Sequence, residues 1–180
     1  FTLGAGRVLI LKGKNGSGKT SLIKTILYLL EPSSGSIYWK GKILPKTIYD
    51  FYNNITYIGD RPTSLKQLTI EENIKIWKKI SISEIDYEKI RNVLTILKLN
   101  NYKNKKVNTL SLGEIKKLEL LRLIIENKKY WLLDEPFTNL DLDSIDIIRQ
   151  TFEEHCKNEG SVLFSSHQDM KFSKYQEIRL

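Results

Sequence analysis

The chain has 180 residues, of which 41% are hydrophobic and 28% charged, a balance that predicts one globular domain and argues against a disordered polypeptide. It has no apolar run long enough to cross a bilayer, no signal-peptide pattern in residues 1–6, and a single cysteine, Cys156, which favours a reducing cytoplasm. The net charge of +8 comes from scattered lysines, and the cluster of Lys103, Lys105 and Lys106 is typical of a solvated loop, so we expect no nucleic-acid partner.

The predicted elements alternate between strands and helices along most of the chain. In order, we expect a strand at 8–11, a helix from 19 to about 30 that Pro32 stops, strands at 37–39 and 55–58, two helical segments between 69 and 99, a polar loop at 100–109, a helix at 111–125, a strand at 130–133, a helix at 143–156 and a strand at 161–165. This order predicts an α/β fold with a mostly parallel sheet flanked by helices. The central helical block interrupts the alternation, so we expect one domain, 1–180, in which 61–125 form a helical subdomain inserted between core segments 1–60 and 126–180.

A glycine-rich segment between the first strand and the first helix carries the strongest motif. Residues 13–20 match the phosphate-binding P-loop in full. The glycines let the backbone wrap around phosphate oxygens, and the amides at the helix N-terminus point at the anion. Lys19 supplies a catalytic cation for the β- and γ-phosphates, and Thr20 offers a hydroxyl to Mg²⁺. A glycine turn that matches by chance is the alternative, which the flanking elements disfavour. We predict ATP binding by Gly13, Asn15, Gly16, Ser17, Gly18, Lys19, Thr20 and Ser21.

Two carboxylates follow the apolar strand at 130–133. Asp134, at the carboxyl end of a strand beside a P-loop, is placed to hold Mg²⁺, often through water. Glu135 is placed to position the attacking water and take its proton. Side chains of adjacent strand residues point to opposite sides, so two different roles are expected.

Three further motifs, in the expected order, resemble those of ATP-binding-cassette (ABC) ATPases. Residues 110–114, Leu-Ser-Leu-Gly-Glu, resemble the family signature; Asn139-Leu140-Asp141 resembles the D-loop; and His167 resembles the switch histidine. The resemblance covers essentially the whole chain. It implies a RecA-like P-loop NTPase fold and ATP hydrolysis with Mg²⁺ as cofactor.

The resemblance also implies a dimer. One subunit would contribute the P-loop, Asp134, Glu135 and His167, while Ser111 and Gly113 of a second nucleotide-binding subunit, which we expect to be another copy of this chain, would meet the same ATP. His167 would contact the γ-phosphate and orient Glu135, and Asp141 would contact the partner across the interface.

Each of these motifs has a plainer interpretation. Ser111 and Glu114 have the spacing of a capping box, which starts a helix, and both roles are compatible because capping and anion binding use the same amides. Asp141 could cap the following helix, and His167 could be a surface histidine.

The family link implies membrane-spanning permease partners and a peripheral position on the cytoplasmic face of the inner membrane. Residues 131–141 and 165–168 are most similar to the compact ABC ATPases of bacterial cytochrome c maturation, which drive haem export or release of a haem chaperone. The alternatives are the ATPase of another small bacterial ABC exporter and a weakly hydrolysing ATP-binding scaffold.

The scaffold interpretation has its basis in departures from the family pattern. Arg61 stands where a magnesium-binding glutamine is usual, and arginine is only a donor. Arg61 could reach a phosphate, Asp60 could replace it as ligand, or activity could be weakened; Gln67 is too far along the chain to substitute. Within the signature, Leu112 replaces a glycine and Glu114 a glutamine.

Only seven residues precede Val8, so the adenine-stacking aromatic residue that usually lies upstream of the P-loop strand in this family is either missing or supplied differently. We expect Tyr38 and Trp39 to be sheet residues and not that platform.

Overall fold

The structure is a computed structural model that describes all residues, 1–180. Its centre is a five-stranded, entirely parallel sheet with the strand order β4-β5-β6-β1-β7. This confirms the predicted α/β fold with a mostly parallel sheet flanked by helices. The strands of this sheet are β1 (Val8–Lys12), β4 (Ile55–Ile58), β5 (Tyr130–Leu133), β6 (Ser161–Ser166) and β7 (Tyr175–Arg179).

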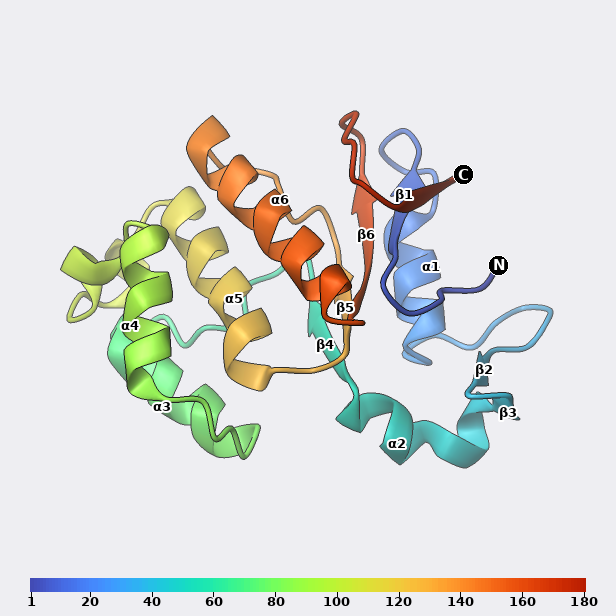
Figure 1. Ribbon diagram of the computed structural model, residues 1–180, viewed down its shortest axis with the longest axis horizontal. Coiled ribbons are helices and arrows are strands. Elements are labelled where there is room, and N and C mark those ends of the chain that lie inside the picture. The colour runs from blue at the N-terminus through green and yellow to red at the C-terminus, as the bar shows by residue number, and fades with distance from the viewer.

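Helices cover both faces of the sheet (Figure 1). The helices are α1 (Lys19–Ile26), α2 (Ile48–Asn53), α3 (Ile70–Ile80), α4 (Tyr87–Ile96), α5 (Leu112–Glu126) and α6 (Leu142–Lys157), with 3-10 turns η1 (Leu44–Thr47), η2 (Asn100–Tyr102) and η3 (Val107–Thr109). Strand β1 shows why two layers form: Leu9 and Leu11 pack in the cluster with α1 and α2, whereas Val8 and Ile10 pack in the cluster with α5 and α6. Alternate strand residues point to opposite faces, so a fully apolar strand needs cover on both sides.

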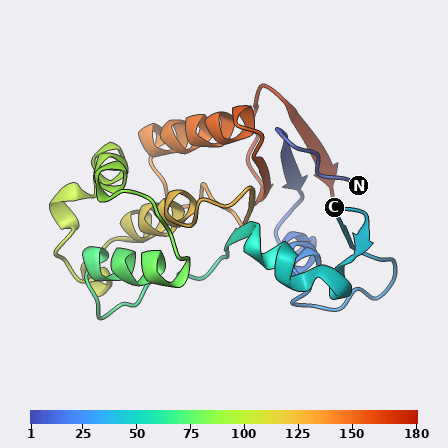
Figure 2. The same cartoon turned by 60° about the horizontal axis from the view of Figure 1, so that its bottom comes forward.

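Helices α3, α4 and α5 gather at the end of the molecule remote from both termini (Figure 2). Their apolar residues belong to the same buried cluster of 26 residues as the face of the sheet under α6. The helical group therefore packs continuously onto the sheet, and the division into a core and a subdomain at 61–125 stays a prediction.

Several element predictions need correction. The first helix ends at Ile26, because Tyr28 adopts the left-handed region with a φ of 56° and leaves Leu29 and Leu30 exposed. The segment expected as a sheet strand at 37–39 reduces to β2 (Tyr38–Trp39), which forms a separate two-stranded antiparallel hairpin with β3 (Lys42–Ile43). The polar loop at 100–109 contains the turns η2 and η3.

Strand β3, turn η1, helix α2 and strand β7 were not predicted. Helix α2 has only six residues, too few for a clear helical period. Strand β7 lies at the sheet edge with mostly exposed residues, so it lacks an apolar run.

Candidate functional site

The P-loop joins the end of β1 to the start of α1. Gly16 and Gly18 have φ values of 83° and 97°, which side-chain-bearing residues rarely adopt. A Cβ at Gly13 would overlap the hydroxyl of Ser17. Lys19 is only 6% exposed, and its Nζ donates to the carbonyl oxygens of Gly13, at 2.8 Å, and of Lys14, at 3.1 Å. The loop therefore curls around the lysine ammonium and places a cation at the N-terminus of α1.

The remaining predicted P-loop residues lie on the same turn. Asn15 is exposed at the tip of the loop, Ser17 has a buried hydroxyl without a hydrogen-bond partner, and Thr20 and Ser21 lie in the first turn of α1. The backbone amides of this turn have the orientation that suits an anion at a helix N-terminus.

Asp134 lies directly after β5 and is 1% exposed. Its backbone N–H donates to the carbonyl oxygen of Ile58 at the end of β4, at 2.8 Å. Its Oδ1 accepts a hydrogen bond from Ser165 Oγ at 2.5 Å, whereas Oδ2 is buried without a partner. A buried carboxylate oxygen without a donor is costly, and it is a suitable ligand for a hard cation.

Ser165 is a residue that the sequence analysis did not single out. Besides donating to Asp134, its Oγ accepts the backbone N–H of Glu135 at 2.8 Å. This contact accompanies a left-handed backbone at Glu135, with a φ of 44°. The only signal in the sequence is a small polar residue at the end of an apolar strand, which by itself is unremarkable.

Glu135 brings the other two predicted catalytic residues together. Its Oε1 lies 3.6 Å from Lys19 Nζ, and its Oε2 lies 3.1 Å from Nδ1 of His167. The Glu135 side chain is 27% exposed and that of His167 is 50% exposed, so the carboxylate faces solvent between a buried cation and an accessible imidazole. This arrangement can hold a water molecule and accept its proton.

The signature residues lie elsewhere in the chain's own structure. Ser111 caps α5 and forms the predicted capping box: its Oγ accepts the N–H of Glu114 at 3.2 Å, and Glu114 Oε2 accepts the N–H of Ser111 at 2.7 Å. Ser111 is exposed, and no hydrogen bond or ion pair joins it to the P-loop of the same chain. Gly113 lies against the D-loop, where an added Cβ would stand 2.7 Å from the carbonyl oxygen of Asn139.

Asp141 caps α6, as its plainer interpretation predicts. It accepts the N–H and the hydroxyl of Ser144, at 2.8 and 2.6 Å, and pairs with Lys117 Nζ at 3.1 Å. The hydrogen bonds from Ser144, with the Lys117 ammonium, hold the pKa of Asp141 well below its usual range. Its predicted contact with a partner subunit remains a prediction.

Arg61, which stands where the family usually has a magnesium-binding glutamine, lies with its neighbours in the loop between β4 and α3. Asp60, Arg61 and Gln67 are all exposed. A second cation that the sequence analysis missed, Lys116 of α5, is half-buried nearby: burial lowers its pKa, while the carboxylates of Asp134 and Glu119 act in the opposite direction. Lys116 was not recognisable because its neighbours come from distant parts of the chain.

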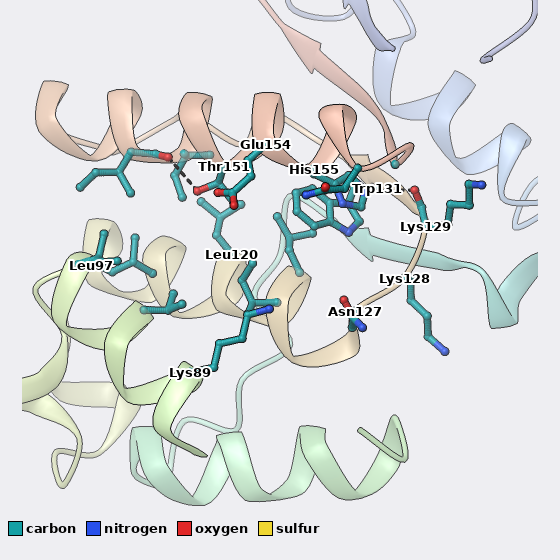
Figure 3. Close-up of a pocket in the computed structure, with 18 of the residues that line it drawn as sticks. Lys89, Leu97, Leu120, Asn127, Lys128, Lys129, Trp131, Thr151, Glu154 and His155 are labelled. Carbon is teal, nitrogen blue, oxygen red and sulfur yellow. Dashed lines mark hydrogen bonds between the residues drawn. The ribbon is translucent and has the colours of Figure 1, made fainter. Parts of the chain in front are cut away.

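A cavity of about 510 Å³ lies between α4, α5 and α6 (Figure 3). Its walls include Leu97, Leu120 and Trp131, and the Trp131 ring stacks on His155 with centroids 3.6 Å apart. None of the predicted site residues lines it. It is therefore separate from the P-loop site.

Comparison with known proteins defines the class to which this fold and site belong. The family model described as "ABC transporter" matches residues 1–138. The chain belongs to this family and is an ATP-binding, ATP-hydrolysing subunit of an ABC transporter.

Individual relatives agree with this assignment. The chain is 35% identical to the cytochrome c biogenesis ATP-binding export protein CcmA of Reclinomonas americana, over 97% of this chain and 78% of the relative. It is 32% identical to the protein of the same name from Histophilus somni, over 98% and 81%. A putative ABC transporter ATP-binding protein from Pyrococcus furiosus superposes with a TM-score of 0.84 at 25% identity, covering 98% of this chain and 86% of that one.

None of the helices is both long and apolar enough to span a membrane. ABC ATPases work with membrane-spanning permease partners, and this chain shares that general property as a member of the family.

Proposed function

We propose that this chain powers a cytochrome c maturation complex, in which ATP hydrolysis drives haem export or the release of a haem-loaded chaperone. The similarity to CcmA proteins over nearly the whole chain supports this pathway. The chain would then sit peripherally on the cytoplasmic face of the inner membrane, bound to permease subunits.

The ATP would bind with its phosphates in the P-loop. Lys19 would exchange its two carbonyl partners for oxygens of the β- and γ-phosphates, because its Nζ already lies at the centre of the loop. Thr20 and Asp134 would hold Mg²⁺, and the unpartnered Oδ2 of Asp134 supports this fit. When bound, the ion neutralises charge that develops on the phosphates.

Hydrolysis would use the carboxylate of Glu135 as the general base. Glu135 takes a proton from a water molecule, the water oxygen bonds to the γ-phosphorus, and the bond to the β-phosphate bridging oxygen breaks, releasing ADP and phosphate. His167 would orient Glu135 through its 3.1 Å contact and donate to the γ-phosphate. The convergence of Lys19, Glu135 and His167 is the observation that carries this proposal.

A second copy of the chain would complete the site. Ser111 and Gly113 are remote from the chain's own P-loop but lie at the exposed N-terminus of α5, which has the orientation for an anion. They would face the γ-phosphate bound by the partner, and Asp141 would lie at the interface beside them. Loss of the γ-phosphate would then release the two chains, a local switch with a global effect.

Two measurements test the proposal. Glu135→Gln removes the base, so MgATP should convert the variant to a stable dimer without turnover, while the exposed control Glu154→Gln should hydrolyse ATP like the wild type. Sedimentation that finds only Glu135→Gln monomers with MgATP would reject the two-chain site.

The pathway is tested by capturing the tagged chain from gently solubilised native membranes and identifying its partners by mass spectrometry. Cytochrome c maturation subunits would support the proposal, whereas another permease would replace the pathway and keep the ATPase. Capture without any membrane protein would favour the scaffold.

A further inference from the structure

The loop between β4 and α3 is tied to the helical part of the molecule by an unusual run of contacts. Three consecutive backbone N–H groups, of Thr63, Ser64 and Leu65, all donate to side-chain oxygens. The first two reach Glu119 Oε1 of α5, at 2.9 and 2.7 Å. The third reaches Asn73 Oδ1 of α3, at 2.7 Å. The conformation of this loop is therefore set by two side chains outside it.

Glu119 is a buried carboxylate, 3% exposed, on the side of α5 that also carries Arg122. Its Oε2 accepts a hydrogen bond from the Thr63 hydroxyl at 2.8 Å and lies 3.6 Å from Arg122 Nη1. A charge buried this deeply is stabilised only by such a full set of donors. An apolar residue would serve packing alone better, so the carboxylate has a task connected with the loop.

The contacts continue from Glu119 back to the sheet. Arg122 donates to Thr63 Oγ1 at 2.8 Å and to Glu126 Oε1 at 2.8 Å, and Glu126 Oε2 accepts the hydroxyl of Thr56 in β4 at 2.8 Å. Helix α5 is thus joined to the strand and to the loop that follows it.

This loop starts at the edge of the sheet where Asp134 lies. Its first residue follows Ile58, whose carbonyl oxygen accepts the Asp134 N–H at 2.8 Å. Asp60 and Arg61 precede the Glu119 contacts by only a few residues. At the other side of the connection, Glu119 lies about two turns along α5 from its N-cap, Ser111.

We propose that Glu119 is a positioning residue that makes the β4–α3 loop and the signature helix move as one body. The proposal rests on the proposed ATPase mechanism. A displacement of Asp60 and Arg61 at one nucleotide would be passed through Thr63 and Ser64 to α5, and so to the Ser111 that serves the partner's nucleotide. Asn73 holds Leu65, the next residue of the loop, and so helps to position the same segment.

The test compares Glu119→Ala with Glu119→Gln. Alanine removes the acceptor for both amides, whereas glutamine keeps one carbonyl oxygen that can accept them. Glu119→Ala should lower kcat by about tenfold, a typical size for coupling between sites, and bring the Hill coefficient for ATP towards one. Its KM for ATP should stay unchanged, because the P-loop is intact, and Glu119→Gln should recover most of the loss.

Leu94→Ala is the control for stability, since Leu94 is buried in α4 and makes none of these contacts. If it lowers kcat as much as Glu119→Ala at a matched loss of melting temperature, or if Glu119→Gln is as impaired as Glu119→Ala, the positioning role is overturned.

Amide hydrogen exchange separates the two proposals. In Glu119→Ala, the amides of Thr63 and Ser64 should exchange about tenfold faster or more, while those of the P-loop keep their rates. If the wild type hydrolyses no ATP, the proposed function fails, and this exchange still reports whether Glu119 holds the loop. Unchanged exchange rates at both amides would show that Glu119 does not hold the loop and would overturn the proposal.

Discussion

Replacing Asp134 with asparagine should separate magnesium binding from folding. The two side chains have nearly the same shape, and asparagine keeps an oxygen to accept the 2.5 Å hydrogen bond from Ser165. The change falls on the other carboxylate atom, Oδ2, which is buried without a partner and becomes an amide nitrogen. An amide nitrogen cannot ligate a cation. The nucleotide-free protein should therefore change little, whereas the magnesium-dependent part of its response to ATP should be lost.

The sizes follow from linkage. At about one hundred times its Kd, a ligand stabilises the native state by about 2.7 kcal/mol. For a chain of this length, 1 kcal/mol moves the melting temperature by about 2–4 °C, so MgATP should raise that of the wild type by about 5–11 °C. In Asp134→Asn, the shift with MgATP should fall to the smaller value that ATP gives with a chelator. Without nucleotide, the two proteins should melt within about 4 °C of each other, since the Ser165 contact remains.

Thermal unfolding followed by circular dichroism, with ATP plus Mg²⁺ or ATP plus EDTA, measures these shifts. Asp143→Asn is the matched control, because Asp143 is an exposed carboxylate that pairs only with the exposed Lys98. It should keep the full MgATP shift. If Asp134→Asn keeps that shift as well, the carboxylate does not hold the ion and the reasoning from its unpartnered oxygen is wrong.

Three further predictions concern groups that the catalytic mechanism does not use. Phe152 is fully buried against the rings of Trp131, Phe137 and Phe164. The substitution Phe152→Ala should therefore lower the free energy of unfolding, measured by urea denaturation, by about 3–5 kcal/mol. Burial lowers the pKa of His155 from its ordinary 6.5, so the unfolded state binds the proton first. The stability that the neutral ring contributes is complete above pH 6.5 and declines as the pH falls below it. In His155→Gln, the melting temperature should therefore depend less on pH below 6.5 than it does in the wild type. Burial raises the pKa of the Cys156 thiol to about 11, so iodoacetamide at pH 8 should label the native protein far more slowly than the urea-unfolded protein.

Each of these predictions has a result that contradicts it. A loss below about 1 kcal/mol for Phe152→Ala would mean that the ring is not in a closed core. An unchanged pH profile in His155→Gln would show that the acid sensitivity has another source. Equal labelling of Cys156 in the native and unfolded states would mean that the thiol is accessible.

Contacts between residues close in the chain could be predicted from the sequence. The strand before Gly13, the start of the helix at Lys19, and the Ser111–Glu114 capping box all appear where expected. Spacing alone fixes such contacts, because a helix brings residues three apart together and a glycine loop closes on its own backbone. Carboxylates directly after a buried strand, Asp134 and Glu135, belong to the same class.

Contacts across the sheet were decided by the tertiary structure. Ser165 meets Asp134 because β5 and β6 are parallel neighbours whose carboxyl ends share one edge. The position of β7 beside β1 and the exclusion of β2 from the central sheet depend likewise on strand order.

The attachment of Glu119 to Thr63 spans 56 residues and is invisible in any local pattern. A glutamate in a helix with several other charged residues looks like a solvent-facing residue until folding buries it among donors from another segment. The sequence alone therefore determined the chemistry present at the nucleotide edge. The packing of distant segments decided which side chains hold that chemistry in place, because their contacts depend on the order of the strands and not on spacing along the chain.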